Sequence, residues 1–577
     1  MSHTLNGIAA GGGITIAPVY VMGASSLAAP NKVADDENHE AQRLRDSFSL
    51  INHDLRQIGD QAEAEFGRPI MTIRTLQTVI NDPAVRQLAM DMLIENHWTA
   101  EWTVEQLVDR LQKLSTIAVS SPFWVGVVHD LGQRLLSHLL QEPIPDVANL
   151  DHRAVVIAHS ISPTQVVRLD RQLVAALVTD EGGATSHFSL LSEELAIPSV
   201  VATHGVTKYA HDDMVAIVDG IHGKVILQPS PQEIDQYQKM AGQYARENSA
   251  LGKLKHQETR STDGQRIRIA ANMSLPDEIN SITHSGAEGV GLFRTEFMLM
   301  EDARFASEDA QFAIYKQVAT AMPERLIVVR TLDIGSDKLV QDASYDDGSN
   351  PALGLRGLRL GLAHQELLRP QIRALLRAAT YGKIAIMFPM VTTLSEFRQA
   401  RQIVDEERQK LTDEGIKIPD NVQVGMMVET PAAVTMIDQF AQYADFFSIG
   451  SNDLAQYLFA VDRTNGQVAP LLQTLHPAML RSVLHVIRQA HNEGKWVSLC
   501  GNMAALHVAE PLLLAMGLDE FSVPSDHILP LRHLISGLSV RQLQPLLHQA
   551  LGLESAAEVE QLIKHSLPEL YQADQNN

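Results

Sequence analysis

One histidine in this sequence stands where a glycine-containing loop gives way to a helical pattern. The stretch GGATSHFSLLSEELAIPSVV, residues 182–201, leads through Thr185 to His187, and apolar residues of helical spacing follow. The unpaired backbone N–H groups at a helix start favour added negative charge, so a phosphoryl group on the ring of His187 would be stabilised there. Thr185 could hydrogen-bond that group or orient the ring. An ordinary surface or core histidine is the alternative, since the chain has 23 histidines.

A second set of chemically capable side chains lies in the C-terminal half, at or just after the ends of predicted strands. It consists of Arg294, Arg330, Asp333, Glu429, Asn452, Asp453 and Cys500. A strand whose only role is in the core does not need a charged or polar residue at its end, and chance does not account for seven such residues. We therefore expect a site where these strands end.

The arginines of this set suit an anionic ligand. Arg294 and Arg330 would bring planar, forked donors towards a phosphate or a carboxylate, and Arg356 and Arg463 could add a third and a fourth. Any one of them taken alone could instead be a surface arginine paired with a local acid. Surface ion pairing is a much weaker explanation for all four arginines together. The group therefore predicts a site for a small phosphorylated anion.

Two carboxylates and a thiol follow neighbouring predicted strands. Glu429 and Asp453 beside a bound phosphate would suit Mg²⁺, which prefers oxygen ligands and keeps several waters. They could also be ion-pair partners of the arginines. Cys500 closes the next strand, where a thiol can give or take a proton, although a lone buried cysteine is more often structural.

Eight candidate strands are spread over the residues from 262 onward, each separated from the next by enough chain for a helix. They are RIRIAAN, GAEGVGLFR, RLIVVRTLD, KIAIMFPM, VQVGMMVE, ADFFSIGSND, KWVSLCGN and DEFSVPS. Eight β/α units in this length predict a (β/α)₈ TIM barrel, whose catalytic groups lie at the carboxyl ends of the strands. The side chains described above would meet at that rim.

The N-terminal half combines a β/α pattern with a helical block. Residues 1–22 read as short strands, and a β/α pattern returns in RAVVIAHSIS, QLVAALVTDEGGATSH, SVVATHG and MVAIVDGIHGKVILQPS. The residues between them, from about 31 to 141, show long amphipathic helices. This order predicts a helical insertion into a small β/α domain.

With 577 residues the chain is too long for one ordinary core, and we expect an α/β multidomain protein. The predicted parts are a β/α domain made of residues 1–28 and 143–229, an inserted all-α subdomain at 29–142, a helical linker at 230–260 and a C-terminal TIM barrel at 261–577.

Composition argues against several classes of partner. The net charge is −23, from 46 basic and 69 acidic residues, so the basic footprint that nucleic-acid binding needs is missing. No run of about 18 uninterrupted apolar residues occurs, so we expect no membrane insertion. The first basic residue is Lys32, which does not suit a secretory signal. A single cysteine excludes an intrachain disulfide, and we expect a cytoplasmic location.

Several segments occur in an order and spacing that resemble the Enzyme I family, the phosphoenolpyruvate–protein phosphotransferases of the bacterial sugar phosphotransferase system. They are GGATSHFSLLSEELAIPSVV, GAEGVGLFRTEF, VRTLDIGSDK, MFPMV, GMMVETPAA, FFSIGSNDLAQY and LCGN, and the similarity runs from about residue 5 to residue 540. The barrel motifs are specific as a set. The motif GGxTSH is less so, because pyruvate phosphate dikinases and phosphoenolpyruvate synthases share it.

The resemblance implies an enzyme that takes the phosphoryl group of phosphoenolpyruvate onto its own histidine and releases pyruvate. A histidine of HPr or an HPr-like phosphocarrier then accepts the group, as the first step of sugar uptake. The β/α domain would be a swivelling phosphohistidine domain and the helical insert would bind HPr. The barrel would bind phosphoenolpyruvate and assemble a homodimer.

Carried over by motif, the resemblance also gives roles to single residues. His187 would be the phosphorylated nucleophile and Cys500 the acid that protonates the departing enolate at its methylene carbon. The other implied residues are the substrate ligands Arg294, Arg330, Arg356, Asn452, Asp453 and Arg463, the Mg²⁺ ligands Glu429 and Asp453, and the supporting residues Thr185 and Lys338.

Several positions depart from the usual pattern of the family. Ala184 stands where Arg or Lys is common, Phe188 where a small residue is usual, and Glu193 where the family has an arginine. Asn502 replaces the acid of CGE, and Ser336 replaces a glycine. A paralogue that serves a dedicated HPr-like domain would fit these changes.

Two other functions compete with phosphotransfer to a carrier. A phosphoenolpyruvate synthase or dikinase needs a separate ATP-grasp domain of several hundred residues, for which 577 residues leave no room. A non-catalytic, phosphoenolpyruvate-binding sensor or regulatory paralogue is the second alternative. The presence of both His187 and Cys500 favours the enzyme.

Overall fold

The described residues of this chain form two compact units, which divide between Asn248 and Ser249. The first unit contains an open sheet and a helical block, and the second contains a closed barrel. The computed structural model of the protein describes residues 2–22, 27, 29, 33–66, 71–118, 122–142, 150, 152–161, 164–165, 169–170, 172–182, 197–296, 307–334, 351–463, 467–468 and 471–568.

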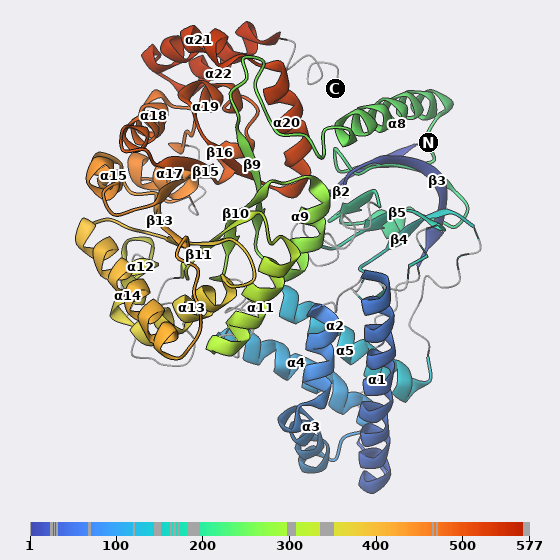
Figure 1. Ribbon diagram of the computed structural model, residues 1–577. Coiled ribbons are helices and arrows are strands. Elements are labelled where there is room, and N and C mark those ends of the chain that lie inside the picture. The colour runs from blue at the N-terminus through green and yellow to red at the C-terminus, as the bar shows by residue number, and fades with distance from the viewer. Residues whose placement is uncertain are drawn as a thin grey trace. The chain divides into compact units, whose positions relative to one another are not determined.

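Within the described part of the first unit, eight strands form one mixed sheet in the order β1-β8-β7-β3-β4-β5-β6-β2. Figure 1 labels β2, β3, β4 and β5 of this sheet. The strands are β1 (His3–Asn6), β2 (Ile8–Gly11), β3 (Ile14–Val21), β4 (Ala154–Ala158), β5 (Val174–Thr179), β6 (Ser199–Val201), β7 (Val215–Asp219) and β8 (Lys224–Leu227), with the short helix η2 (Val206–Lys208) before β7. Strand β3 pairs with β4 in parallel and with β7 in antiparallel orientation. The strands that precede the helical block therefore complete the sheet that the later strands build.

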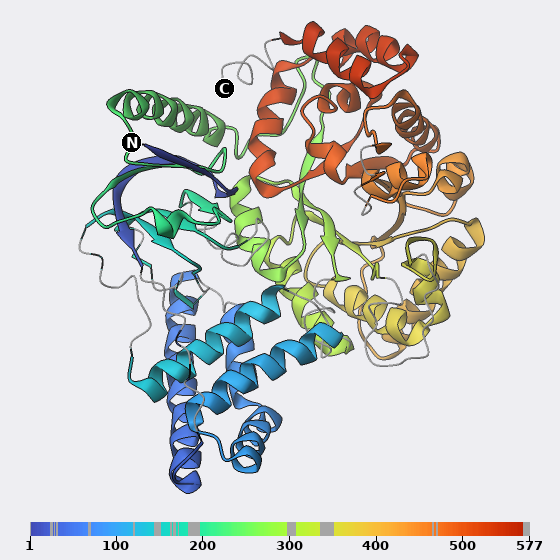
Figure 2. The ribbon, with the colours of Figure 1, turned by 180° about the vertical axis from the view of Figure 1, so that it is seen from behind.

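The helical block lies in sequence between β3 and β4 and forms a group of helices (Figure 2). Its buried residues form a core of their own. Its helices are α1 (Glu37–Phe66), α2 (Met71–Asn81), α3 (Pro83–Asn96), α4 (Ala100–Ala118) and α5 (Pro122–Leu140). Leu44, Leu93 and Leu131 from three different helices are buried together in that core. The predicted fold class, a β/α domain with an inserted all-α part, is confirmed.

Helix α8 (Pro231–Gly252) follows the sheet and packs against it. Tyr237 and Met240 of this helix contact Ile217 of β7 and Ile226 of β8. The apolar face of a charged helix is therefore covered by the sheet that precedes it in sequence. None of the helices in the described part of the chain is both long and apolar enough to cross a membrane.

The second unit is built around a closed barrel in which every neighbouring pair of strands is parallel. Its strands are β9 (Arg268–Met273), β10 (Gly289–Arg294), β11 (Leu326–Arg330), β12 (Ile384–Phe388), β13 (Gln423–Val428), β14 (Phe446–Gly450), β15 (Trp496–Cys500) and β16 (Glu520–Val523). They close in sequence order, with β16 paired to β9. The predicted C-terminal TIM barrel is therefore confirmed.

Helices surround this barrel on the outside (Figure 1). They are α9 (Ile279–Ser285), α11 (Glu308–Ala321), α12 (Leu358–Ala363), α13 (Gln365–Ala378), α14 (Leu394–Asp413), α15 (Pro431–Thr435), α16 (Ile437–Phe440), α17 (Ser451–Phe459), α18 (Pro477–Asn492), α19 (Glu510–Met516), α20 (Ile528–Gly537), α21 (Val540–Gly552) and α22 (Ala556–Ser566). Four 3-10 helices stand beside them in the described chain: η3 (Pro276–Glu278), η6 (Pro351–Leu353), η8 (Asn502–Ala505) and η9 (Ser525–His527).

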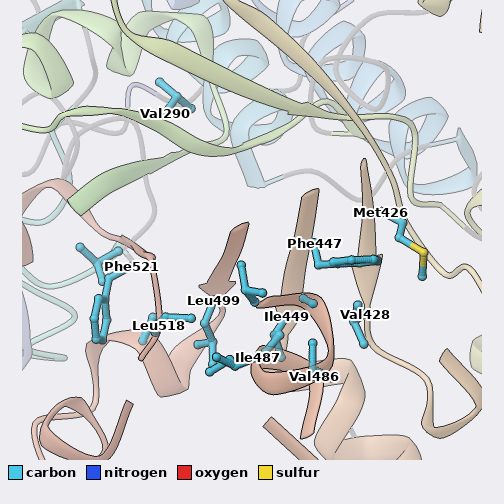
Figure 3. Packing of buried hydrophobic residues seen from close by; sticks show 14 of the residues in the cluster. Val290, Met426, Val428, Phe447, Ile449, Val486, Ile487, Leu499, Leu518 and Phe521 are labelled. Carbon is cyan, nitrogen blue, oxygen red and sulfur yellow. The ribbon is translucent and has the colours of Figure 1, made fainter. Parts of the chain in front are cut away.

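The barrel strands are mostly apolar because they are buried on both faces. The residues of the outer face pack against the surrounding helices: Leu499 and Ile449 lie near Val486 and Ile487 of α18 (Figure 3). The residues of the inner face form a separate cluster of Leu292, Val328, Ala385, Met387, Met427, Phe446 and Cys500. Each strand therefore alternates between the two layers, and this alternation decides which side chains reach the inside of the barrel.

Candidate active site at the carboxyl rim of the barrel

Two arginines lie on the inner face of the barrel at its carboxyl end. Leu292 and Val328 belong to the inner cluster, so Arg294 and Arg330, two residues later on the same strands, share that face. They are the last residues of β10 and β11 and face each other in the strand register. The period of the strands thus places both of these predicted side chains at the rim.

Arg330 is held there by two acids. It is only 8% exposed, its Nη1 lies 3.1 Å from Oδ2 of Asp333, and its Nη2 donates to Glu296. Burial alone would lower the pKa of Arg330, but the charges of Glu296 and Asp333 raise it above its ordinary value. The guanidinium is therefore charged and fixed in direction.

Arg356 joins two acids from different parts of the rim. Its Nε and Nη2 lie 2.9 and 3.0 Å from the two oxygens of Asp333, and its Nη1 and Nη2 lie 3.2 and 3.3 Å from those of Asp453. Arg463 approaches Asp453 at 3.5 Å. Burial would raise the pKa of Asp333, but the charges of Arg330 and Arg356 lower it. The arginines and acids thus form one ionised network.

Glu429 directly follows β13 and is 1% exposed. Its Oε1 accepts a hydrogen bond from the backbone N–H of Met390 at 2.5 Å, while its Oε2 is buried and finds no hydrogen-bond partner among the described residues. Burial and the neighbouring charges of Asp453 and Asp333 raise the pKa of Glu429 to about 8. A side chain at Gly450 would start 2.8 Å from Oε2, so the glycine leaves that oxygen its space.

These two carboxylates fit a divalent cation. A buried carboxylate oxygen without a partner, next to a second carboxylate, is unfavourable unless a positive charge compensates it. Glu429 and Asp453 offer the hard oxygen donors that a cation such as Mg²⁺ prefers. The unpartnered Oε2 of Glu429 is the observation that favours this assignment.

Cys500 ends β15 on the inner face and is 2% exposed. Ser448 on the neighbouring strand donates a hydrogen bond to its Sγ at 3.5 Å. Burial raises the pKa of the Cys500 thiol, although Ser448 and the charges of Arg330 and Arg294 act in the opposite direction. The sulfur is therefore protonated at neutral pH and able to act as an acid.

The residues after Cys500 hold an amide pair at the rim. Asn502 donates its backbone N–H to Oδ1 of Asn452 at 3.0 Å, and Nδ2 of Asn452 lies 3.4 Å from Oδ1 of Asn502. Gly501, which directly precedes Asn502, has φ +91°, a conformation that favours glycine. Asn502, the departure from the CGE pattern, thus contacts a predicted substrate ligand.

The structure brings together every predicted site residue that it describes: Arg294, Arg330, Arg356, Glu429, Asn452, Asp453, Arg463 and Cys500. His187, Thr185 and Lys338 lie outside the described residues, as do Ala184, Phe188, Glu193 and Ser336. The sequence prediction missed Glu296 and Ser448. Glu296 follows Arg294 by two residues, so strand alternation could have revealed it.

Models of the PEP-utilising enzymes match most of the chain. They are the PEP-binding domain at residues 248–540, the mobile domain at residues 150–223 and the N-terminal domain at residues 6–116. The first match alone spans the barrel and the rim described above.

Full-length relatives agree with these matches. A phosphoenolpyruvate-protein phosphotransferase of Bacillus sp. (strain S) is 39% identical over 567 residues, covering 98% of this chain and 98% of the relative. Proteins of the same name from Listeria monocytogenes and Bacillus subtilis are 38% and 37% identical and cover 98% and 97% of this chain and 99% of each relative. The chain belongs to the PEP-utilising enzymes and, among them, to the family of the phosphoenolpyruvate-protein phosphotransferases.

Proposed function

We propose that this chain transfers the phosphoryl group of phosphoenolpyruvate to its own His187 and then to a histidine of HPr or an HPr-like carrier, releasing pyruvate. This would be the first step of sugar uptake by a phosphotransferase system. Membership of a transferase family supports the reaction class. The observation that carries the proposal is the barrel rim, where arginines, two carboxylates and a protonated thiol lie together.

The arginines are the proposed ligands of the substrate anion. Arg294, Arg330 and Arg356 would hold the phosphate, and Asn452 and Arg463 would complete the contacts to the rest of the substrate. During transfer, negative charge spreads over the oxygens of the moving group, so fixed cationic donors stabilise the transition state. The acids that hold Arg330 and Arg356 orient these donors before substrate arrives.

Glu429 and Asp453 are the proposed ligands of a divalent cation, which we take to be Mg²⁺. Bound there, the cation would neutralise part of the charge on the phosphate. Glu429 must release its proton to bind it, because the pKa of its carboxyl is raised to about 8. Asp453 would exchange part of its contact with Arg356 for the cation.

The proposed first half-reaction breaks the bond between phosphorus and the enolic oxygen and forms a bond between phosphorus and a ring nitrogen of His187. That nitrogen must be unprotonated, so the ring proton belongs on the other nitrogen. The enolate then takes a proton at its methylene carbon from the thiol of Cys500, which yields pyruvate. A thiol whose pKa is raised by burial keeps its proton until the enolate forms.

The parts of the chain have separate proposed roles. Residues 1–28 and 143–229 would form the swivelling phosphohistidine domain, residues 29–142 would bind the carrier, and residues 230–260 would be the linker. The barrel at 261–577 would bind phosphoenolpyruvate and assemble a homodimer. We place the reaction in the cytoplasm, where a lone thiol stays reduced.

The test is incubation of the chain with phosphoenolpyruvate and Mg²⁺, followed by intact-mass measurement. We expect a gain of one acid-labile phosphoryl group in the wild type and none in His187→Ala. Subsequent addition of HPr should remove the group from the enzyme. No gain in the wild type would favour the non-catalytic sensor, a reading that the names of the relatives do not support. Reversion of Glu193 to Arg and of Asn502 to Glu would then be tested first.

A further inference from the structure

Two histidines and a glutamate that the proposed reaction does not use lie together at the carboxyl end of the barrel. His507 and Glu510 come from the segment that follows β15, and His527 comes from η9, which follows β16. One imidazole nitrogen of each histidine and a carboxylate oxygen of Glu510 all lie within 4.8 Å of one another. Nδ1 of His507 is 3.2 Å from Oε2 of Glu510, and Nε2 of His527 is 2.5 Å from its Oε1.

The carboxylate of this cluster is buried, so its negative charge needs positively charged or hydrogen-bonding partners. The side chain of Glu510 is 0% exposed, that of His527 is 15% exposed, and that of His507 is 61% exposed. Burial would raise the pKa of Glu510, but the hydrogen bonds and charges of the two histidines lower it. Among the described residues, its ion-pair partners are these histidines and neither a lysine nor an arginine. The buried carboxylate is therefore faced by two imidazoles, and a divalent cation held between the three side chains would balance its negative charge without requiring either imidazole to be protonated.

We propose that His507, Glu510 and His527 bind a divalent transition-metal cation of the zinc type. Two imidazole nitrogens and one carboxylate oxygen are a ligand set of Zn²⁺, whereas Mg²⁺ prefers oxygen alone. Ligand atoms around a tetrahedral Zn²⁺ lie about 3.3 Å apart, so small side-chain rotations suffice from the observed spacing. The exposed side of His507 gives the cation its entry path and leaves a fourth position for water.

This site is distinct from the proposed substrate-bound cation. Its ligands share no residue with Glu429 and Asp453, and two of its three donors are nitrogen. A cation bound there would join the segment after β15 to the segment after β16. The first of these segments begins with Gly501 and Asn502, directly after Cys500, so the cation would also fix the rim beside the thiol.

The test is a titration of the full-length chain, freed of metal by a chelator, with Zn²⁺ in the presence of excess Mg²⁺. We expect one tight Zn²⁺ per chain in the wild type. In His507→Ala, affinity for that equivalent should fall about 100-fold or more, since loss of even an outer-shell partner costs roughly 10- to 100-fold. His548→Ala is the matched control, because His548 is also an exposed histidine of the same unit and lies outside the cluster.

Two further measurements keep the test decisive. Glu510→Gln conserves the size of the buried side chain and should also lose the tight equivalent. Zn²⁺ should raise the midpoint of thermal unfolding of the wild type and of His548→Ala but not of His507→Ala. The proposal is wrong if the wild type binds no Zn²⁺, or if His507→Ala binds it as tightly as His548→Ala does.

Discussion

Glu429→Gln tests the electrostatics of the rim most directly. Glutamine conserves the shape of the side chain and its oxygen can still accept the hydrogen bond from the backbone N–H of Met390. The substitution removes the negative charge that Asp453 and Asp333 repel and that burial disfavours. It also removes the oxygen for which the described residues offer no partner.

The expected effect depends on pH with a definite sign. The pKa of Glu429 is about 8 in the folded chain against an ordinary value of 4.5. Between these values the folded state holds a proton that the unfolded state has released, so the free energy of unfolding falls as pH rises through this window. Each pKa unit is worth about 1.4 kcal/mol, which gives on the order of 5 kcal/mol by pH 9. Glutamine does not titrate, so Glu429→Gln does not lose this stability as the pH rises.

The assay is thermal unfolding of both proteins at pH 5 and pH 9 in the presence of a chelator. We compare the midpoint of Glu429→Gln with that of the wild type at each pH. The difference, variant minus wild type, should be larger at pH 9 than at pH 5 by roughly 5 to 10 °C. Excess Mg²⁺ at pH 9 should stabilise the wild type and leave the variant unchanged. An equal difference between the two proteins at both pH values would refute the reasoning.

Glu407→Gln is the matched control for this experiment. Glu407 is a buried glutamate of α14, 2% exposed, but it faces Arg369 and Lys410. Burial would raise its pKa, and the hydrogen bonds and charges of these partners lower it instead. The stability that Glu407 contributes is therefore present above its ordinary pKa, and its replacement should destabilise the chain at both pH values.

Three further substitutions test the other parts of the rim. Gly501→Ala places a side chain in a backbone with φ +91° and 2.5 Å from Oγ of Ser451, so unfolding should require about 1–3 kcal/mol less, as measured by chemical denaturation. Arg356→Lys loses the paired hydrogen bonds to Asp333 and Asp453, and the rate of phosphoenolpyruvate-dependent phosphorylation should fall on the order of 10²- to 10³-fold in rapid-quench assays. Ser448→Ala removes a hydrogen bond that lowers the pKa of Cys500, so the pH profile of thiol alkylation, which reports the only cysteine, should move to higher pH.

The order of strands and the identity of the rim residues could be predicted because both depend on local sequence. Mostly apolar runs such as LIVVR and FFSIG predict buried parallel strands. A polar residue at the end of such a strand lies at the barrel rim if it falls on the inner face of the alternating pattern. Arg330 and Cys500 obey that period. The presence of eight β/α units then fixes where the ends meet.

The partners of these residues could not be predicted, because they depend on contacts between distant parts of the chain. Arg356 lies outside any strand, yet it joins Asp333 to Asp453, and Asp453 follows Arg356 by 97 residues. The cluster of His507, Glu510 and His527 likewise exists only because β15 and β16 are neighbours in the barrel. Sequence shows that such residues are present, but their register in three dimensions decides whether they touch.

Charge balance links the two kinds of ligand that the rim is proposed to bind. Without ligands, Asp333 and Asp453 neutralise Arg356, and Asp333 also neutralises Arg330. An anion that takes the arginines must share them with these acids, and a cation that takes Asp453 leaves Arg356 in need of an anion. Each ligand thus relieves the charge that the other leaves behind, and by linkage each should raise the affinity of the other. The ion pairs within the rim stabilise it in the absence of substrate. They also favour binding of the cation and the phosphate together over binding of either one alone.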